Sequence, residues 1–305
     1  MRHVPVLTQE VLDGLQITPG MRVLDATVGL GGHARLLLAA NTPNGELIAF
    51  DRDARNLEAA RKALAQDEKR IRFIHDSYAN LEAYALDPIG AAVFDLGYSS
   101  VHVDDAARGF SFQKDGPLDM RYDTRQELTA ATIINSWNKD ELAALFRKLG
   151  EESFAAQIAD AIVAHRKKQR FERTVQLADV ITETIRRRGR VHPATKVFQA
   201  LRIAVNDEFG ELERGLAAIE KVLAPGGRVA IITFHSLEDR LVKQFIKASL
   251  LLDPINKKVI RPSHEEGQTN PRARSAKLRV AQKMRTPSVH VEDYEESHYN
   301  IQDAG

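Results

Sequence analysis

The feature that most constrains the fold is a short apolar run that ends in an acid and leads into a glycine-rich loop. The run ends on Asp25, the loop contains Gly29, Gly31 and Gly32, and a helix-like stretch, 34–40, follows. Glycines permit a tight turn and a close approach of backbone to a ligand, and the first turn of a helix offers free N–H groups. This order predicts an α/β sheet with a nucleotide-sized pocket.

The glycine spacing by itself leaves the ligand open. Gly29-x-Gly31-x-x-Ala34 also satisfies the dinucleotide fingerprint, so NAD(P), FAD, S-adenosylmethionine and a turn without any ligand all remain alternatives. A second apolar run ends on Asp51, about 20 residues beyond the glycines, where a ribose-binding carboxylate is expected. Because a carboxylate accepts two hydrogen bonds from a ribose diol, Asp51 suits the adenosine of any of these cofactors.

The first hundred residues alternate between strand-like and helix-like patterns. Continuous apolar strands separated by helices indicate a parallel sheet that is covered on both faces. Four acids, Asp25, Asp51, Asp76 and Asp95, follow four of the expected strands. Since ligands of such sheets bind at the carboxyl ends of the strands, we expect all four acids to lie at one edge, beside the ligand.

Strand signals disappear between residues 104 and 206, where helical periodicity predicts helices over 141–149, 154–165, 177–187 and 195–205. This region is predicted to be a helical domain inserted into the sheet domain, which consists of residues 1–103 and 207–305. A helix over 208–223, stopped by Pro225-Gly226-Gly227, then leads into a strand over 228–233. A further helix is expected over 237–251 and a strand over 277–283.

Composition excludes several classes of site. The chain has no cysteine, so disulfides, thiolate nucleophiles and cysteine-ligated metals are ruled out. No H-x-x-x-H or H-E-x-x-H spacing occurs, and we predict no metal site. No apolar run approaches the roughly 18 residues of a membrane span, and the N-terminus has no signal-peptide pattern. We expect a cytoplasmic protein with no membrane partner.

The net charge of +1 hides an uneven distribution. Basic residues are concentrated in 165–170 and 186–190, and 257–285 contains nine Lys or Arg against two Glu. Basic clusters are typical of surfaces that bind nucleic acid, although a charge run is also the ordinary solvated face of a helix. The acidic end, 292–305, carries no functional prediction.

Two further segments carry chemistry near the expected pocket. Arg108-Gly-Phe110-Ser-Phe112 combines rings with a cation, as single-strand nucleic-acid platforms do, but each ring alone also suits the core. His235 and Ser236 lie near acids, yet no G-x-S-x-G elbow is present, so a Ser-His-acid hydrolase is disfavoured. We expect Ser236 to cap the following helix, with Asp239 completing a capping box.

The chain closely resembles the bacterial 16S ribosomal RNA cytosine N4-methyltransferases, the family of ribosomal RNA small subunit methyltransferase H. The likeness extends from His3 to about Lys283 and rests on long strings in a fixed order. These strings are Asp25-Ala-Thr-x-Gly-x-Gly-Gly-His33, Asp51-Arg-Asp53, Asp95-Leu-Gly-x-Ser-Ser100, Asp104-Asp-Ala-x-Arg-Gly-Phe-Ser-Phe112, Asp115-Gly-Pro-Leu-Asp-Met-Arg121, His192-Pro-Ala-Thr195, Phe198-Gln-Ala-Leu-Arg-Ile-Ala-Val-Asn206, Phe234-His-Ser-Leu-Glu-Asp-Arg240 and Asn270-Pro-Arg-x-Arg-Ser275.

The resemblance implies a Rossmann-like class I methyltransferase domain that uses S-adenosylmethionine, with an inserted all-helical domain for RNA. It implies methylation of the exocyclic N4 of a decoding-centre cytosine, C1402, in the 16S ribosomal RNA of the small subunit. The family usually has Gln where this chain has His102, Val at Tyr98 and Arg at Leu30. Carried onto matching positions, the cofactor contacts are Gly31, Gly32, His33, Asp51, Tyr78, Asp95 and His102.

We predict that Asp95, or a neighbouring backbone carbonyl, orients the target amine, and that Tyr98 or Phe110 stacks on an extruded base. The residues predicted to contact RNA are Arg108, Phe110, Arg121, Arg187, Arg272 and Arg274, and Lys277 is a further candidate for gripping phosphate. Two alternatives are a nicotinamide-dependent oxidoreductase and a non-catalytic RNA-binding factor. The sequence leaves open whether the protein is a monomer or a homodimer.

Overall fold

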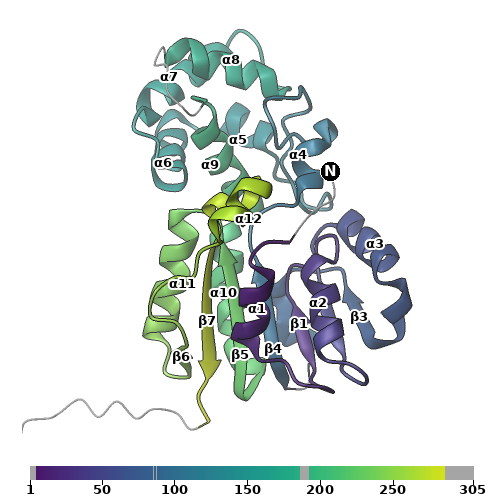
Figure 1. Cartoon of the computed structure of the whole chain (residues 1–305). Helices are drawn as coiled ribbons and strands as arrows, with labels where there is room; N and C mark the ends of the chain where they lie inside the picture. Colours follow the sequence, from purple (N-terminus) through teal and green to yellow (C-terminus); the bar gives the residue numbers. More distant parts are fainter. Residues whose placement is uncertain (1–4, 85, 87, 186–191, 286–305) are drawn as a thin grey trace, which may run out of the picture.

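The computed structural model describes residues 5–84, 86, 88–185 and 192–285. It shows a sheet domain with a helical domain stacked on one end of it (Figure 1). Within the described residues the sheet has seven strands in the order β3-β2-β1-β4-β5-β7-β6. The strands are β1 (Val23–Asp25), β2 (Leu47–Phe50), β3 (Ile71–Ile74), β4 (Ile89–Asp95), β5 (Leu223–Thr233), β6 (Leu252–Pro254) and β7 (Lys277–Lys283).

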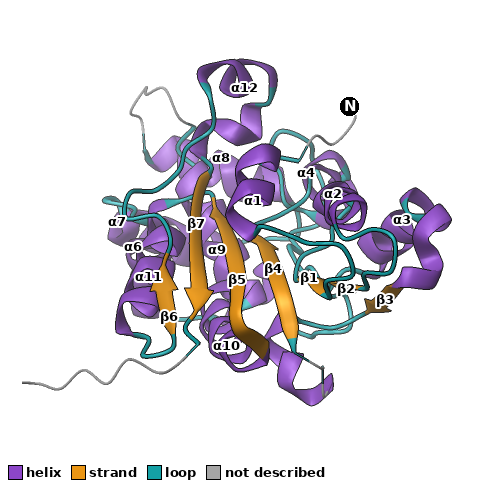
Figure 2. Ribbon diagram, turned by 60° about the horizontal axis from the view of Figure 1, so that its bottom comes forward, coloured by secondary structure: helices purple, strands orange, loops and turns teal. Residues whose placement is uncertain are grey.

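Strands β1 to β5 run parallel, and β7 runs antiparallel to both of its neighbours, β5 and β6. β4, β5 and β7 lie side by side in Figure 2. The predicted parallel sheet is therefore confirmed for the first half of the chain, and the predicted strand over 277–283 has the bounds that the alternation of its residues indicated. This is the Rossmann-like α/β sheet that the sequence predicted.

Both faces of the sheet are covered by helices, which explains why the strands are apolar on both sides. One buried cluster joins the sheet to the first group of helices, and a second joins its opposite face to the other group. The first group is α1 (Thr8–Leu15), α2 (Gly32–Ala40) and α3 (Ala54–Ala63). The second group is α10 (Glu208–Val222), α11 (Ser236–Ala248) and the 3₁₀ turn η2 (Tyr78–Tyr84).

The junction between α10 and β5 differs from the prediction. The expected helix stop at Pro225-Gly226-Gly227 lies inside β5, which already begins at Leu223. The register against β4 shifts there, since Ile89 pairs with Leu223 and Ala91 pairs with Arg228. Gly226 has a φ of 82°, a left-handed conformation that glycine adopts at little cost. The proline and the glycines therefore form a bulge within the strand.

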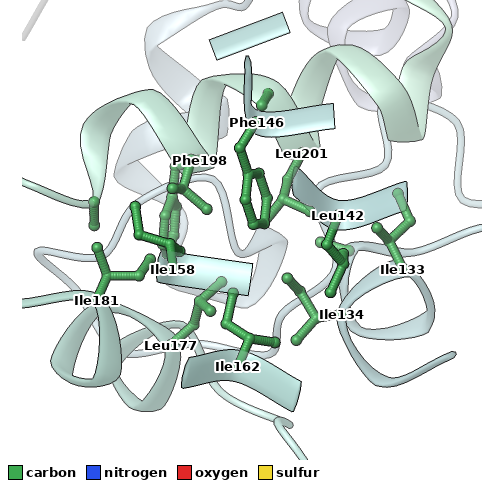
Figure 3. Close-up of a cluster of buried hydrophobic side chains, with 14 of the residues drawn as sticks. Ile133, Ile134, Leu142, Phe146, Ile158, Ile162, Leu177, Ile181, Phe198 and Leu201 are labelled. Carbon is green, nitrogen blue, oxygen red and sulfur yellow. The ribbon is translucent and has the colours of Figure 1, made fainter. Parts of the chain in front are cut away.

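The helical domain has a hydrophobic core of its own, formed by buried residues from Leu118 to Val205 (Figure 3). Its helices are α5 (Ala130–Ser136), α6 (Lys139–Gly150), α7 (Ala155–Arg166), α8 (Thr174–Thr184) and α9 (Thr195–Asn206). The four helices predicted by periodicity in this part of the chain are present as α6 to α9, and α5 was not predicted. The expected end of the third, at 187, lies outside the described residues.

The helical domain is connected to the carboxyl end of β4 and to the start of α10. The chain leaves β4 through α4 (Ser100–Asp104) and the 3₁₀ turn η3 (Ala106–Arg108), and it returns directly from α9 into α10. Both connections therefore lie at the sheet edge where ligands of parallel α/β sheets bind. The domain of residues 104–206 is in this way placed over the ligand-binding edge.

The helices of the described ranges include none that is long and apolar enough to cross a membrane. The longest of the helices named above, α10, has 15 residues. A membrane-spanning helix needs about 20 predominantly apolar residues.

Candidate active site

A cavity lies at the carboxyl ends of β1, β2 and β4. Six of the seven predicted cofactor residues line it; the exception is Gly31. Its lining also includes residues from the helical domain's connections and from α10 and α11, which the sequence did not single out for this site. The lining comprises Pro5, Thr27, Gly29, Gly32, His33, Asp51, Arg52, Tyr78, Asp95, Tyr98, His102, Tyr122, Glu208, Glu211, Glu238 and Arg272, among others.

The glycine loop turns sharply between β1 and α2. Gly31 has a φ of 83°, caps the N-terminus of α2 and donates its N–H to the carbonyl of Val28 at 2.8 Å. A Cβ on Gly31 would lie 3.3 Å from the side chain of Leu64, so this position faces α3 and not the cavity. Gly31 shapes this turn and does not line the cavity, so its contact with the cofactor stays a prediction, whereas Gly29 lines the cavity.

Asp51 is held in place by backbone groups of two loops. Its carboxylate accepts the N–H of Gly29 at 2.9 Å and the N–H of Asp53 at 2.8 Å, and the amide of Asn56 lies 3.2 Å from Oδ2. Burial raises the pKa of Asp51, and these hydrogen bonds oppose the shift. The carboxylate therefore lies at the end of β2 with a fixed orientation, as a ribose-binding acid requires.

Asp95 lines the cavity, and one of its carboxylate oxygens, Oδ1, is buried and left without a hydrogen-bond partner among the described residues. Its Oδ2 lies 3.6 Å from Nδ1 of His33, whose Nε2 donates to the carbonyl of Val6 at 2.9 Å. The backbone N–H of Asp95 donates to Thr27 Oγ1 at 2.8 Å. A buried polar atom without a partner costs free energy, so Oδ1 is suited to a ligand that can donate to it.

Asp25 follows β1 but does not line the cavity. Its side chain is buried behind the loop, where Oδ1 accepts the N–H of Thr27 at 3.1 Å. Burial, reinforced by the nearby charges of Asp95 and Asp51, raises its pKa from an ordinary value of 3.8 to about 8. Asp25 is therefore a protonated, structural residue at neutral pH. The expectation that all four strand-end acids lie beside the ligand is wrong for Asp25 and for Asp76, since neither lines the cavity.

The raised pKa of Asp25 makes stability depend on pH. The folded protein keeps a proton that the unfolded chain loses between about pH 4 and pH 8, so the free energy of unfolding falls as pH rises through this window. The contribution of this one group is at most about 1.4 kcal/mol per pH unit. We expect Asp25→Asn to remove that slope in urea unfolding measured from pH 5 to 8.

The matched control for this prediction is Asp76→Asn. Asp76 follows β3, accepts hydrogen bonds from Tyr84 and Asn80, and has a lowered pKa despite partial burial. It therefore titrates below the measured range in both states. An unchanged slope in Asp25→Asn would contradict the assignment.

Tyr78 forms one wall of the cavity. Its ring packs edge-on against Phe94 at a centroid distance of 5.2 Å, and burial raises the pKa of its hydroxyl far above the usual range. The ring rests against α10 at Gly215, where an added Cβ would lie 2.3 Å from the Tyr78 ring. Because glycine has no side chain, the Tyr78 ring can occupy the space beside α10. In this position the ring offers a flat apolar face to the cavity, on which an adenine ring could stack.

We expect Gly215→Ala to weaken binding of an adenosine cofactor roughly tenfold, because it forces the Tyr78 ring out of position; tenfold corresponds to about 1.4 kcal/mol. Gly210→Ala on the same helix is the control, since its Cβ would meet only the movable carboxylate of Asp207. Isothermal titration with S-adenosylhomocysteine measures both variants. Equal affinities would contradict the role of Tyr78.

His102 lines the cavity within a buried network. Its Nε2 donates to Asp53 Oδ2 at 2.9 Å and its Nδ1 accepts the N–H of Ser99 at 3.1 Å, which assigns the proton to Nε2. Burial alone would raise the pKa of Asp53, but the hydrogen bonds from His102 and Arg108 outweigh it and hold the pKa well below its usual range. His102 thus ties the loop after β4 to the loop after β2.

Two residues predicted to contact RNA are engaged inside the protein. The guanidinium of Arg108 is buried: it donates to Asp53 at 2.6 Å and to the carbonyls of Arg121 and Tyr122 at 2.7 and 3.0 Å. We therefore correct the RNA role of Arg108 to an internal one. The ring of Phe110 stacks on that of Tyr122 at 5.4 Å, with an interplanar angle of 13°, and does not line the cavity.

Arg121 also makes contacts within its own loop. Its guanidinium binds Asp119 and donates to the carbonyls of Thr124 and Gln126, and about a fifth of its side chain is exposed. These hydrogen bonds stabilise the loop that precedes α5. They also occupy most of the N–H donors of the Arg121 guanidinium, which the prediction had assigned to RNA.

The other predicted RNA residues differ in their surroundings. Arg272 lines the cavity, with its guanidinium 5.0 Å from the centre of the Phe234 ring. Arg274 is exposed and donates one N–H to the carbonyl of Gly267. Lys277 lies 3.3 Å from Asp239, so its charge is balanced within β7 and α11. Arg187 lies outside the described residues.

A buried ion pair, which sequence reasoning missed, lies on the side of the cavity away from the glycine loop. Arg202 donates two hydrogen bonds to Glu208, at 2.7 and 2.9 Å, and the hydroxyl of Tyr122 donates to the same carboxylate at 3.0 Å. The Arg202 guanidinium also lies 4.8 Å from the centre of the Tyr98 ring. The only sequence signal for this ion pair is that Arg202 belongs to one of the strings shared with the family, 198–206.

The start of α11 differs from the expected cap. The N-cap is His235, not Ser236, and the residue that completes the capping box is Glu238, not Asp239. Because His235 Nδ1 accepts the N–H of Glu238, its Nε2 carries the proton in the neutral ring, 3.0 Å from a Glu238 oxygen. Glu208, His235 and Glu238 offer ligand atoms within 4.8 Å of one another. The Glu208 carboxylate is bound by Arg202, whereas His235 Nε2 makes no hydrogen bond within the described part of the chain.

Comparison with known proteins agrees with this architecture. The profile of the MraW methylase family matches residues 1–284. Proteins named ribosomal RNA small subunit methyltransferase H are similar: that of Nostoc sp. PCC 7120 is 48% identical over 284 residues, covering 92% of each chain. That of Cyanothece sp. PCC 7425 is 49% identical over 283 residues, covering 92% of this chain and 95% of the relative. The chain therefore belongs to the MraW methylase family.

Proposed function

We propose that this protein transfers a methyl group from S-adenosylmethionine to the exocyclic N4 of a cytosine in 16S ribosomal RNA, the decoding-centre C1402. The observation that carries the proposal is Asp95, whose Oδ1 is buried and has no hydrogen-bond partner among the described residues, and which lines the same cavity as Asp51, the proposed ribose-binding carboxylate. The methylase family and the names of its relatives support the class of reaction and the RNA substrate.

The residues present fit the cofactor. Asp51 is oriented to accept the ribose hydroxyls, and Tyr78 offers a ring face for adenine. Asp95, Glu208, Glu211 and Glu238 add carboxylates around the cavity, which suits a ligand with a positively charged sulfur and an ammonium group. A nicotinamide cofactor would share the first two contacts, but the methylase family supports S-adenosylmethionine.

S-adenosylmethionine supplies a methyl group bound to a positively charged sulfur, which keeps the bonding electrons when the methyl group leaves. The amine of cytosine is a poor nucleophile because its lone pair is delocalised into the ring. A hydrogen bond from N4 to Asp95 Oδ1 would favour a pyramidal nitrogen whose lone pair is free to attack, and alignment of the reacting atoms lowers the barrier further. The same oxygen can then accept the proton that N4 loses.

The helical domain, 104–206, is proposed as the RNA-recognition domain. Arg272 and Arg274 are positioned at the cavity and beside it, where they can meet phosphates of the bound strand. Tyr98, which is 37% exposed, offers a ring on which an extruded base can stack. A substrate within the small ribosomal subunit also implies a cytoplasmic location.

The test is transfer of a labelled methyl group to small-subunit RNA, with the product nucleoside identified by mass spectrometry. N4-methylcytidine at the decoding centre is the expected product, and a different base or no transfer would overturn the proposal. Thermal stabilisation by S-adenosylhomocysteine but not by NAD distinguishes the methyltransferase from an oxidoreductase. RNA binding without transfer would favour a non-catalytic binding factor. Light scattering of the same samples separates a monomer from a homodimer.

A further inference from the structure

The short loop Asp51-Arg52-Asp53 connects the cofactor cavity to the helical domain. Asp51 and Arg52 line the cavity. Arg52 also donates hydrogen bonds to the base of the helical domain, and Asp53 is linked to the same base through Arg108. We call that base the neck and define it as residues 120–126 together with 205–206, the two segments to which Arg52 and Arg108 are bound. The side chains of this loop therefore lie between the proposed cofactor site and the helical domain that is proposed to bind RNA.

Arg52 binds both segments of the neck. Its guanidinium donates to the carbonyl of Asn206 at 2.8 Å and to the side-chain oxygen of Gln126 at 3.2 Å. Gln126 in turn donates to the carbonyl of Val205 at 2.7 Å. The carbonyl of Arg52 itself lies 3.1 Å from His75 Nε2, at the end of β3. The Arg52 side chain thus binds both segments of the neck to the carboxyl edge of the sheet.

Arg108 links the same loop to the neck through a second set of hydrogen bonds. One nitrogen of its guanidinium donates to Asp53, and the other donates to the carbonyls of Arg121 and Tyr122 in the neck. The guanidinium and the Asp53 carboxylate are both buried, with side-chain exposures of 5% and 6%. Hydrogen bonds between buried charged groups are strong and directional, so they hold the neck in one orientation.

The two segments of the neck are also bound to each other. The side chain of Asn206 accepts the N–H of Tyr122 at 2.8 Å and donates to the carbonyl of Met120 at 2.8 Å. Tyr122 lines the cavity as well. The two segments are therefore held together as one unit, and movement of that unit relative to the loop would break the hydrogen bonds of Arg52 and Arg108 together.

We propose that Arg52 and Arg108 are positioning residues for methyl transfer, which set the angle of the helical domain over the cofactor loop. This inference rests on the proposed function, since it assumes that the helical domain delivers the base. The target amine must approach the methyl group within a fraction of an ångström, and misplacement by about 1 Å can cost roughly 100-fold in rate. Neither arginine touches the reacting atoms in this role.

The experiment compares Arg52→Gln and Arg108→Gln with a matched control, Arg55→Gln. Arg55 lies on the same side of the loop but forms an exposed pair with Asp105. At saturating RNA and cofactor we expect kcat to fall at least about tenfold in Arg52→Gln and Arg108→Gln, with little change in the KM for RNA, and no change in the control. Arg108→Lys should recover part of the rate, because a lysine can still reach Asp53.

A second measurement does not depend on activity. Because the chain has no cysteine, spin labels can be attached at Lys62→Cys in the sheet domain and Lys168→Cys in the helical domain. Double electron–electron resonance should give one narrow distance distribution in the parent and in Arg55→Gln, and a broader or shifted one in Arg52→Gln and Arg108→Gln.

The outcomes separate this inference from the proposed function. An unchanged distance distribution in both arginine variants would overturn the positioning role. So would a loss of rate that is fully explained by weaker S-adenosylhomocysteine binding or by a lower melting temperature. Absence of methyl transfer in the parent protein would overturn the proposed function alone, because the distance measurement still tests how the helical domain is held.

Discussion

Replacement of Asp95 by Asn is expected to lower the single-turnover rate of methyl transfer about 100-fold or more at saturating cofactor and RNA. Asparagine keeps the size of the side chain but loses the charge that accepts a hydrogen bond and a proton from the target amine. Loss of one well-placed polar group in an active site has effects of this size. Rapid-quench measurement with labelled cofactor gives the rate directly.

The matched control is Asp76→Asn, because Asp76 also follows a strand of the sheet but does not line the cavity. It should keep the parent rate within about twofold. The affinity for S-adenosylhomocysteine, measured separately, shows whether both variants are saturated in the assay. A full single-turnover rate in Asp95→Asn would show that another group, such as a nearby backbone carbonyl, orients the amine.

Arg202→Met is expected to cost about 3–5 kcal/mol of the free energy of unfolding, the largest loss of stability that we predict. The Arg202–Glu208 pair is 89% buried on each side, and its removal would leave the Glu208 carboxylate in a buried, acidic environment beside Glu238. Urea unfolding followed by circular dichroism measures the change.

Arg214→Met provides the comparison, since Arg214 pairs with Asp207 at the surface, where more than half of each side chain is exposed. Surface pairs contribute about 0–1 kcal/mol. The double variant Arg202→Met, Glu208→Leu should recover much of the loss, because it removes both charges together. A loss of under about 1 kcal/mol in Arg202→Met would show that the buried pair is not important for stability.

The architecture was largely predictable because it depends on local patterns. Apolar runs with alternating helices indicate a parallel sheet wherever they occur, and the periodicity of 139–206 indicated helices that the structure contains. The bulge at Pro225-Gly226-Gly227 was not predictable in this way. Proline and glycine stop a helix and also form a bulge, and only pairing with β4 decides between the two.

The site was predictable only in part, because charged residues near a strand end have several uses. Of the four acids, Asp51 and Asp95 line the cavity, Asp25 is buried behind it, and Asp76 holds the 3₁₀ turn η2 through Tyr84. All four are aspartates within two residues of the end of a strand. What differs is the direction of the side chain and the groups that surround it.

The sequence by itself determined that this protein has a glycine loop and an acid, Asp51, suited to an adenosine cofactor, and a helical domain inserted into its sheet domain. Those features depend on local backbone structure, which residues close together in the sequence determine. Only the tertiary structure decided that the Arg108 guanidinium is bound to Asp53 inside the protein, and that Arg202 pairs with Glu208, a residue that lines the cavity. The reason is that a charged side chain can pair with a residue far away in the sequence, which local patterns do not reveal. Whether the side chain is buried in that pair then decides whether it can bind a ligand.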